Sequence, residues 1–150
     1  MRKTLFLVVT ALLATGCGAG LAAVTQPGTA KIELRLIAKN EADGFKVPTW
    51  DGKLFMFVEK QAPLTDRDVE TVRLAKLPTG APAINLQLDQ TASLALEDIT
   101  LKNVGRRLAI LVDGKIVIAP TIKERITGGS MTVAGFDATQ TANIFARIKK

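Results

Sequence analysis

The sequence predicts an α+β domain in which an antiparallel sheet carries helices on one face. Three observations favour this fold class. Apolar and polar residues alternate in several short segments, as they do in half-buried strands. Asp113-Gly114 separates two apolar β runs, and this dipeptide is typical of the two-residue turn of an antiparallel hairpin. Two other segments carry apolar residues at helical spacing, and two helices suffice to cover one face of a sheet.

The first expected strand covers residues 32–36, where Ile and Leu alternate with Glu33 and Arg35. This alternation predicts a half-buried strand. Thr65 and Asp68 match a capping box, which predicts only a short helix because a strand pattern follows at once. The other expected strands are 54–59, 71–77, 84–88, 108–112, 115–119 and 131–134.

Two helices complete the expected fold. Asp89 is placed to cap a helix over about 90–103, which Gly105 then ends. Asp137 is placed to cap the final helix. The residues expected to form the apolar faces are Ala92, Leu96 and Ile99 on the first helix and Ala138, Ala142, Phe145 and Ile148 on the second.

The N-terminal residues predict export from a bacterial cell. Arg2 and Lys3 precede an apolar run at 5–14, which has the length of a signal-peptide core and is too short for an ordinary membrane span. The run ends in small residues followed by Cys17, an arrangement that resembles a bacterial lipobox. The resemblance implies cleavage before Cys17 and acylation of its thiol. An ordinary secretory signal, cleaved after Ala22 or Ala23, is the alternative.

The expected organisation has three parts: a signal peptide at 1–16, the lipidated Cys17 with a flexible tether at 17–30, and one domain at 31–150. A coil of that tether's length spans roughly 20 Å, so the domain is expected close to its membrane. In a cell with two membranes, Gly18 after the cysteine favours the periplasmic face of the outer membrane. In a cell with one, the outer face of the plasma membrane is expected.

Composition excludes several classes of activity. The chain has 150 residues with no His and one Cys, which removes Ser-His-Asp and Cys-His catalysis and multi-cysteine metal sites. The close carboxylates of Asp66, Asp68 and Glu70 fit helix caps and solvated faces better than a calcium loop. Removal of Arg2 and Lys3 with the signal peptide lowers the net charge from +6 to +4, a modest value, and export argues against a nucleic-acid partner. No enzyme, cofactor or metal is therefore expected.

A longer series of motifs identifies a family. Residues 103–115 read Asn-Val-Gly-Arg-Arg-Leu-Ala-Ile-Leu-Val-Asp-Gly-Lys, followed by Ile-Ala-Pro at 118–120 and Ile-Thr-Gly-Gly-Ser at 126–130. Together with Pro-Leu-Thr at 63–65, this series resembles the head of the large periplasmic domain of SecD, a subunit of the bacterial protein-export machinery. The likeness covers about residues 54–150. It implies a ferredoxin-like head of the kind that grips exported polypeptide, which SecD moves with membrane-spanning segments driven by the proton gradient.

The resemblance implies a lipid-anchored binding module that contacts exported or envelope polypeptides and has no proton-driven motor of its own. The alternative is a structural protein that docks one fixed partner in the envelope, such as a component of the Sec translocon. An envelope enzyme is the third reading, but no recognisable arrangement of Ser, Lys or carboxylates supports it.

One departure from the family marks a candidate partner site. Leu94 and Leu101 lie seven residues apart, on a helix face where SecD-like heads usually carry polar side chains. Either local packing covers them or they form an exposed ridge that meets a partner. Arg106 and Arg107 either complement the helix dipole or contact an acidic lipid or peptide. The motif residues expected to serve the backbone are Asn103, Gly105, Asp113, Gly114, Gly128 and Gly129.

Overall fold

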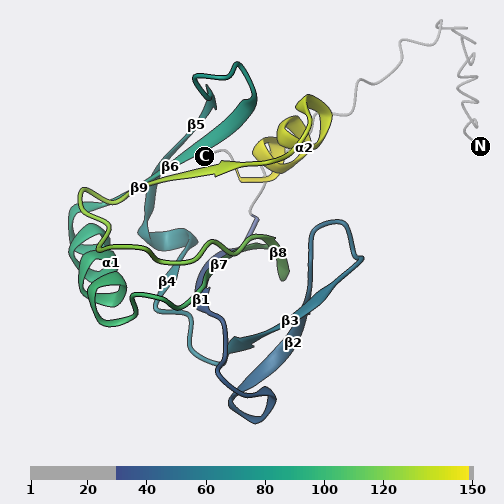
Figure 1. The fold of residues 1–150 in the computed structure, drawn as a ribbon. Helices are drawn as coiled ribbons and strands as arrows, with labels where there is room; N and C mark the ends of the chain where they lie inside the picture. Colours follow the sequence, from purple (N-terminus) through teal and green to yellow (C-terminus); the bar gives the residue numbers. More distant parts are fainter. Residues whose placement is uncertain (1–29, 149–150) are drawn as a thin grey trace, which may run out of the picture.

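The computed structural model describes residues 30–148 (Figure 1). The signal peptide, Cys17 and most of the expected tether lie outside these residues. The strands are β1 Ile32–Leu36, β2 Gly44–Pro48, β3 Phe55–Glu59, β4 Leu64–Thr65, β5 Val69–Lys76, β6 Pro82–Leu88, β7 Leu108–Val112, β8 Lys115–Ile118 and β9 Ser130–Ala134. The helices are α1 Gln90–Lys102 and α2 Ala138–Ile148, with short 3-10 turns η1 Glu41–Asp43 and η2 Asp66–Asp68.

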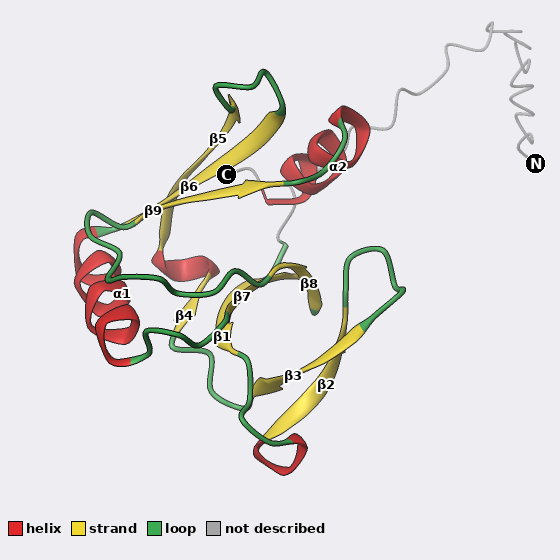
Figure 2. Ribbon diagram, in the orientation of Figure 1, coloured by secondary structure: helices red, strands yellow, loops and turns green. Residues whose placement is uncertain are grey.

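The antiparallel α+β fold is confirmed, and its strands are divided among three sheets (Figure 2). The largest has the order β4-β1-β7-β8, the second has the order β5-β6-β9, and β2 and β3 form the third. Every strand pair within these sheets is antiparallel. Sequence patterns give the direction of local hairpins, but not which hairpins share a sheet.

The main core lies between the four-stranded and the three-stranded sheets. Both contribute fully buried aliphatic side chains, among them Leu34 of β1 and Leu86 of β6. The two helices lie at opposite ends of this core (Figure 1), with Leu96 of α1 and Ile144 of α2 completely buried. The domain thus closes one continuous core from segments far apart in the sequence.

The helices adopt slightly different rotations from those expected. On α1, Ile99 is only partly buried and Thr100 takes the buried position in that turn. On α2, Ala138 and Ala142 are exposed, while larger residues fix the buried face. Those residues are Thr141, Ile144 and Ile148, with Phe145 partly buried beside them. Burial of a branched side chain stabilises the fold more than burial of an alanine methyl group. Ile144 and Ile148 therefore determine which face of α2 turns toward the core.

Strand β1 is buried on both faces, which corrects the expectation of a half-buried strand. Glu33 and Arg35 are only 7% and 9% exposed. The β2–β3 hairpin covers their face of the sheet and creates a second small core, formed by Val47, Val58, Ala109, Leu111 and Ile116. The sequence patterns did not predict β2, because its five residues, which end in Pro48, show no clear alternation.

The local signals at turns and caps are confirmed. Asp113 and Gly114 have φ of 49° and 75°, as a two-residue turn between β7 and β8 requires. The Asp89 carboxylate accepts a hydrogen bond of 2.8 Å from the Ala92 amide at the start of α1. The capping box at Thr65 opens η2 alone, and β5 follows immediately.

Candidate functional site

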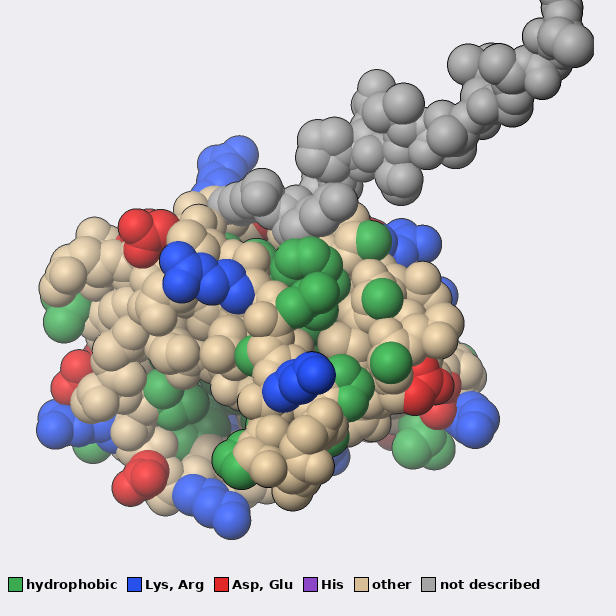
Figure 3. Space-filling model, turned by 90° about the horizontal axis from the view of Figure 1, so that it is seen from above, with side chains coloured by type: hydrophobic (Ala, Val, Ile, Leu, Met, Phe, Trp, Pro, Cys, Tyr) green, Lys and Arg blue, Asp and Glu red, His purple; other side chains and the backbone are tan. Residues whose placement is uncertain are grey.

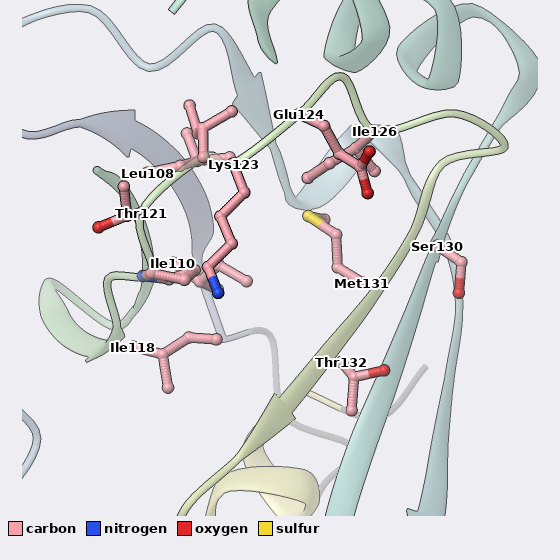
Figure 4. Close-up of a pocket in the computed structure, with 12 residues that line it drawn as sticks. Leu108, Ile110, Ile118, Thr121, Lys123, Glu124, Ile126, Ser130, Met131 and Thr132 are labelled. Atoms are coloured by element: carbon pink, nitrogen blue, oxygen red, sulfur yellow. The ribbon is translucent and has the colours of Figure 1, made fainter. Parts of the chain in front are cut away.

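An open apolar groove lies between the 118–126 segment and strand β9 (Figure 4). Its floor comes from Leu108 and Ile110 of β7, both buried, and the Met131 side chain projects into it from β9. The groove has a volume of about 340 Å³. The remaining lining residues are Ile118, Pro120, Thr121, Ile122, Lys123, Glu124, Ile126, Ser130 and Thr132.

Backbone hydrogen bonds hold the 118–126 wall of this groove in place. The amide of Leu108 donates to the Pro120 carbonyl at 3.0 Å, and the Ile122 amide donates to the Arg106 carbonyl at 2.8 Å. At its far end, the Ile126 amide donates to the hydroxyl of the buried Thr100 at 2.9 Å. The wall is therefore fixed to β7 and α1, and beyond the end of β8 at Ile118 it continues outside the regular sheet.

Strand β9 forms the opposite wall and is an edge strand. Among residues 30–148, its one sheet partner is β6, which lies on the side away from the groove. An edge strand presents main-chain amide and carbonyl groups that an added extended chain can pair with. Apolar lining beside such an edge offers pockets for alternate side chains of that chain.

The motif segments identified in the sequence border this groove. Residues 118–120 lie at one wall, and 126–130 lead into β9 at the other. Sequence reasoning assigned the glycines here to backbone shape but did not assign the groove itself. Its lining comes from three separated segments, so no local pattern marks it. In the sequence, the SecD-like motif segments at 118–120 and 126–130 were the one signal that pointed to this region.

Leu94 and Leu101 lie on the solvent side of α1. They are 61% and 56% exposed, so packing within the described domain does not cover them. Val104, which the sequence reasoning did not select, is 53% exposed just beyond the helix. These three side chains, named here the α1 ridge, are separate from the lining of the groove.

The two arginines differ in their surroundings. The Arg106 guanidinium donates to the Ile37 carbonyl at 2.9 Å and to the Asn103 side chain at 2.8 Å, and it pairs with Glu59. It therefore ties the end of α1 to the residue that follows β1 and to β3. Arg107 is exposed and donates to the Ala119 carbonyl at 2.8 Å. Of the two, Arg107 is the one with its side chain open to solvent.

The remaining motif residues cap a helix or adopt backbone conformations that favour glycine. Asn103 is the C-cap of α1, and its side chain donates to the Ile99 carbonyl at 2.8 Å. Gly105, Gly128 and Gly129 have φ of 85°, 74° and 66°, values that favour glycine. Gly129 is also buried against Ser93 of α1.

Several charged groups of the described domain form ion pairs or helix caps. Among residues 30–148, no group of three or more His, Cys, Asp or Glu side chains is placed to bind a metal. The Asp68 carboxylate accepts a hydrogen bond from the Thr65 amide at 2.7 Å, in agreement with a capping role. Within the same residues, neither helix has the length and apolar character needed to cross a membrane.

Comparisons with known proteins agree with this geometry. The family model "SecDF, P1 head subdomain" matches residues 41–148. The SecD subunit of the protein translocase of Treponema pallidum is 34% identical over 102 residues, which are 68% of this chain and 17% of that protein. The SecD subunit of Aquifex aeolicus is 29% identical over 127 residues, or 77% of this chain and 25% of that protein.

A solved structure gives the same fold. SecDF, described there as "a membrane component … that enhances protein export", superposes with a TM-score of 0.64 at 22% identity. The match covers 81% of this chain and 62% of that one. The chain spans only a fraction of the length of the curated relatives, 17% and 25% for the two SecD subunits. By its sequence and its fold, the chain belongs to the SecDF P1 head subdomain family.

Proposed function

We propose that this protein is a lipid-anchored binding module that contacts exported or envelope polypeptides and performs no catalysis. The observation that carries the proposal is the apolar groove beside the free edge of β9. Membership of the SecDF P1 head subdomain family supports an association with protein export, since the relatives are subunits of the protein translocase. Components of the Sec translocon are accordingly candidate neighbours.

The groove suits an extended chain better than a folded partner. A polypeptide segment lying along β9 gains main-chain hydrogen bonds that do not depend on its sequence. Alternate side chains then enter the groove over Leu108, Ile110 and Met131, where apolar residues are preferred. Binding of this kind is broad and weak, as a module that meets many exported chains requires.

Membrane attachment in this proposal depends on Cys17, which lies outside the described residues. The lipobox-like sequence supports acylation at this position, and two or three acyl chains give stable anchoring. The protein then faces the periplasm from the outer membrane, or the exterior from a single membrane. A Cys17→Ala variant is expected to lose acyl-chain labelling and to leave the membrane fraction. Membrane retention without labelling would contradict the lipid anchor.

Site-specific photo-crosslinking in cells tests the polypeptide contact. A photoreactive residue replaces Thr121 or Thr132 on the two walls of the groove, with Thr139 on the exposed side of α2 as the matched control. We expect adducts with many exported proteins from the groove positions and few from position 139. Equal labelling from all three positions, or one dominant adduct, would contradict a broad polypeptide-binding groove.

A second candidate function rests on the α1 ridge. Exposed Leu94, Leu101 and Val104 favour docking to one fixed partner in the envelope or the translocon. A crosslinker at 94 or at 101 would then yield a single dominant adduct, and Leu94→Asp would remove the adduct formed from position 101. Groove crosslinks that persist in Leu94→Asp would separate the two functions.

A further inference from the structure

We propose that the domain rests on an anionic lipid surface through the corner formed by the loop between β2 and β3 and the turn between β7 and β8. This membrane corner comprises Trp50, Lys53, Leu54 and Phe55, with Lys46, Lys115 and Arg147 around them. The inference rests on the membrane attachment in the proposed function, and it adds which face of the domain is turned toward the lipid.

The corner carries large apolar side chains in solvent. Leu54 is 65% exposed and Phe55 is 54% exposed, and they are neighbours in the chain. The indole of Trp50 is partly buried at the base of the same loop. Exposed aromatic and aliphatic side chains on a loop tip are costly in water, and they are typical of segments that enter the headgroup region.

Cations surround these apolar groups. The Lys46 ammonium lies 4.5 Å from the centre of the Phe55 ring. Lys115 and Arg147 each lie 5.9 Å from the centre of the Trp50 ring. Aromatic side chains with adjacent Lys and Arg match the composition of membrane–water interfaces, and the cations complement anionic headgroups. The face of the domain seen from above carries hydrophobic side chains among separate Lys, Arg, Asp and Glu side chains (Figure 3).

The loop is held rigidly in this exposed arrangement. Its ends are joined because the Thr49 amide donates to the Leu54 carbonyl at 2.8 Å and the Leu54 amide donates to the Thr49 hydroxyl at 3.1 Å. Asp51, the acidic residue of the loop, accepts hydrogen bonds from the Thr49 hydroxyl and the Lys53 amide. The Trp50 amide donates to the Ile116 carbonyl at 2.8 Å, which fixes the loop to β8.

The start of the domain is tied to the same corner. The Lys31 amide donates to the Asp113 carboxylate at 3.1 Å, and the Asp113 amide donates to the Lys31 carbonyl at 2.9 Å. The other carboxylate oxygen of Asp113 pairs with Arg147 at 2.9 Å, and this guanidinium lies over Trp50. The chain therefore enters the domain at the membrane corner, so an anchor at its N-terminal end holds this corner toward the lipid.

Chain length keeps the domain close to its membrane. The segment that joins Cys17 to the domain, residues 18–30, has 13 residues, and even a fully extended segment of that length reaches about 45 Å. The α1 helix lies on the far side of the domain from the β2–β3 loop (Figure 1). With the membrane corner on the lipid, the α1 ridge with Leu94 and Leu101 points away from the membrane and stays accessible to partners.

Quenching of a single tryptophan by brominated lipid tests the proposal. Trp50 is the one Trp of the chain, so a Trp50→Phe background allows a reporter to be placed elsewhere. Leu54→Trp places it at the membrane corner, and Leu94→Trp is the matched control at a similarly exposed leucine. The full membrane-extracted protein is reconstituted into vesicles of phosphatidylcholine and phosphatidylglycerol with brominated acyl chains.

We expect fluorescence at position 54 to be quenched about threefold more than at position 94, because an interfacial side chain reaches the boundary of the acyl region. Replacing phosphatidylglycerol by phosphatidylcholine is expected to reduce this difference. Equal quenching at the two positions, in protein that sediments with the vesicles, would overturn the membrane corner and leave the anchor intact. Failure of both variants to sediment with vesicles would overturn the anchor and the corner together.

Discussion

Gly129 lies directly against Ser93, so that helix α1 and the loop before β9 meet at a position without a side chain. A β-carbon on Gly129 would collide with the Ser93 hydroxyl and would lie 2.8 Å from the Ser93 β-carbon. The serine is not free to move, because its hydroxyl donates to the Asp89 carbonyl at 2.7 Å. Gly129 also has φ of 66°, where L side chains are strained.

Gly129→Ala is therefore expected to lower the free energy of unfolding by about 3 kcal/mol, from left-handed strain and overpacking together. Gly128→Ala is the matched control, since its φ is 74° but no atom lies within 4 Å of the place that its new methyl group would take. We expect it to cost about 1 kcal/mol. Urea denaturation measures both, and equal losses would show that the contact with Ser93 is unimportant.

The buried pair of Glu33 and Arg35 supports a second prediction. The Arg35 Nε donates to the Glu33 carboxylate at 2.9 Å, and the same guanidinium donates to the carbonyls of Glu59 and Lys60. Arg35→Ala leaves the carboxylate and both carbonyls without this partner, at an expected cost of about 3 kcal/mol in unfolding free energy.

Lys31→Ala is the control for that pair. Lys31 also contacts the Glu33 carboxylate, at 2.6 Å, but its side chain is largely exposed. Its removal is expected to cost less than about 1 kcal/mol. Chemical denaturation of both variants checks the contrast. A loss as large in Lys31→Ala as in Arg35→Ala would mean that burial of the Arg35 guanidinium is not decisive.

The same pair predicts a dependence of stability on pH. The hydrogen bond from Arg35 holds the pKa of Glu33 below its usual value of 4.5, against the opposing effect of burial, with a smaller contribution from Lys31. As the pH falls, the Glu33 carboxyl is therefore protonated at a higher pH in the unfolded chain than in the folded domain. The stabilisation is therefore complete above pH 4.5 and is lost as the pH falls through the lower pKa of the folded state.

Glu33→Gln is expected to remove this contribution to the acid sensitivity of the domain. The measurement is the urea midpoint of the two proteins at a series of pH values from neutral to acid. The wild-type midpoint should fall more steeply than that of the variant below the usual pKa of a Glu carboxyl. Parallel curves would show that Glu33 titrates alike in the folded and unfolded chains.

Thr100 links α1 to the wall of the candidate groove. Its hydroxyl donates to the Leu96 carbonyl at 2.7 Å and accepts from the Ile126 amide at 2.9 Å. Thr100→Val keeps the shape but leaves the partly buried Ile126 amide without this partner, at an expected cost of about 1–3 kcal/mol. Thr100→Ser keeps the hydroxyl and is the control. Amide exchange at Ile126 should accelerate in Thr100→Val, and unchanged exchange would contradict this role.

The features that the sequence predicted well are those decided by a few adjacent residues. The Asp113-Gly114 turn needs positive φ at both positions, and Asp89 caps α1 with its own carboxylate. The buried polar face of β1 was not predictable in this way. Glu33 and Arg35 alternate with apolar residues as solvent-facing residues do. They are buried because the β2–β3 hairpin, a separate segment of the sequence, packs over their face of the sheet.

The candidate groove shows the same limit. Its walls come from 118–126 and β9 and its floor from β7, so the groove exists only after the sheets have packed. The α1 ridge was easier to recognise, because helical spacing places Leu94 and Leu101 on one face without any knowledge of the sheets. Whether a partner docks on that face depends on the surface of a second molecule. The sequence patterns of this chain alone therefore do not predict the docking.

Substitutions on the α1 ridge separate a docking surface from core packing. Leu94 and Leu101 are both more than half exposed, so Leu94→Asp and Leu101→Asp are each expected to change the unfolding free energy by no more than about 0.5 kcal/mol. Leu96 on the same helix is completely buried, and Leu96→Ala is expected to cost about 2–5 kcal/mol. Thermal and urea unfolding measure all three. A large loss of stability in the Asp variants would mean that the ridge supports the fold, whereas unchanged stability with loss of a crosslinked partner would assign the two leucines to docking.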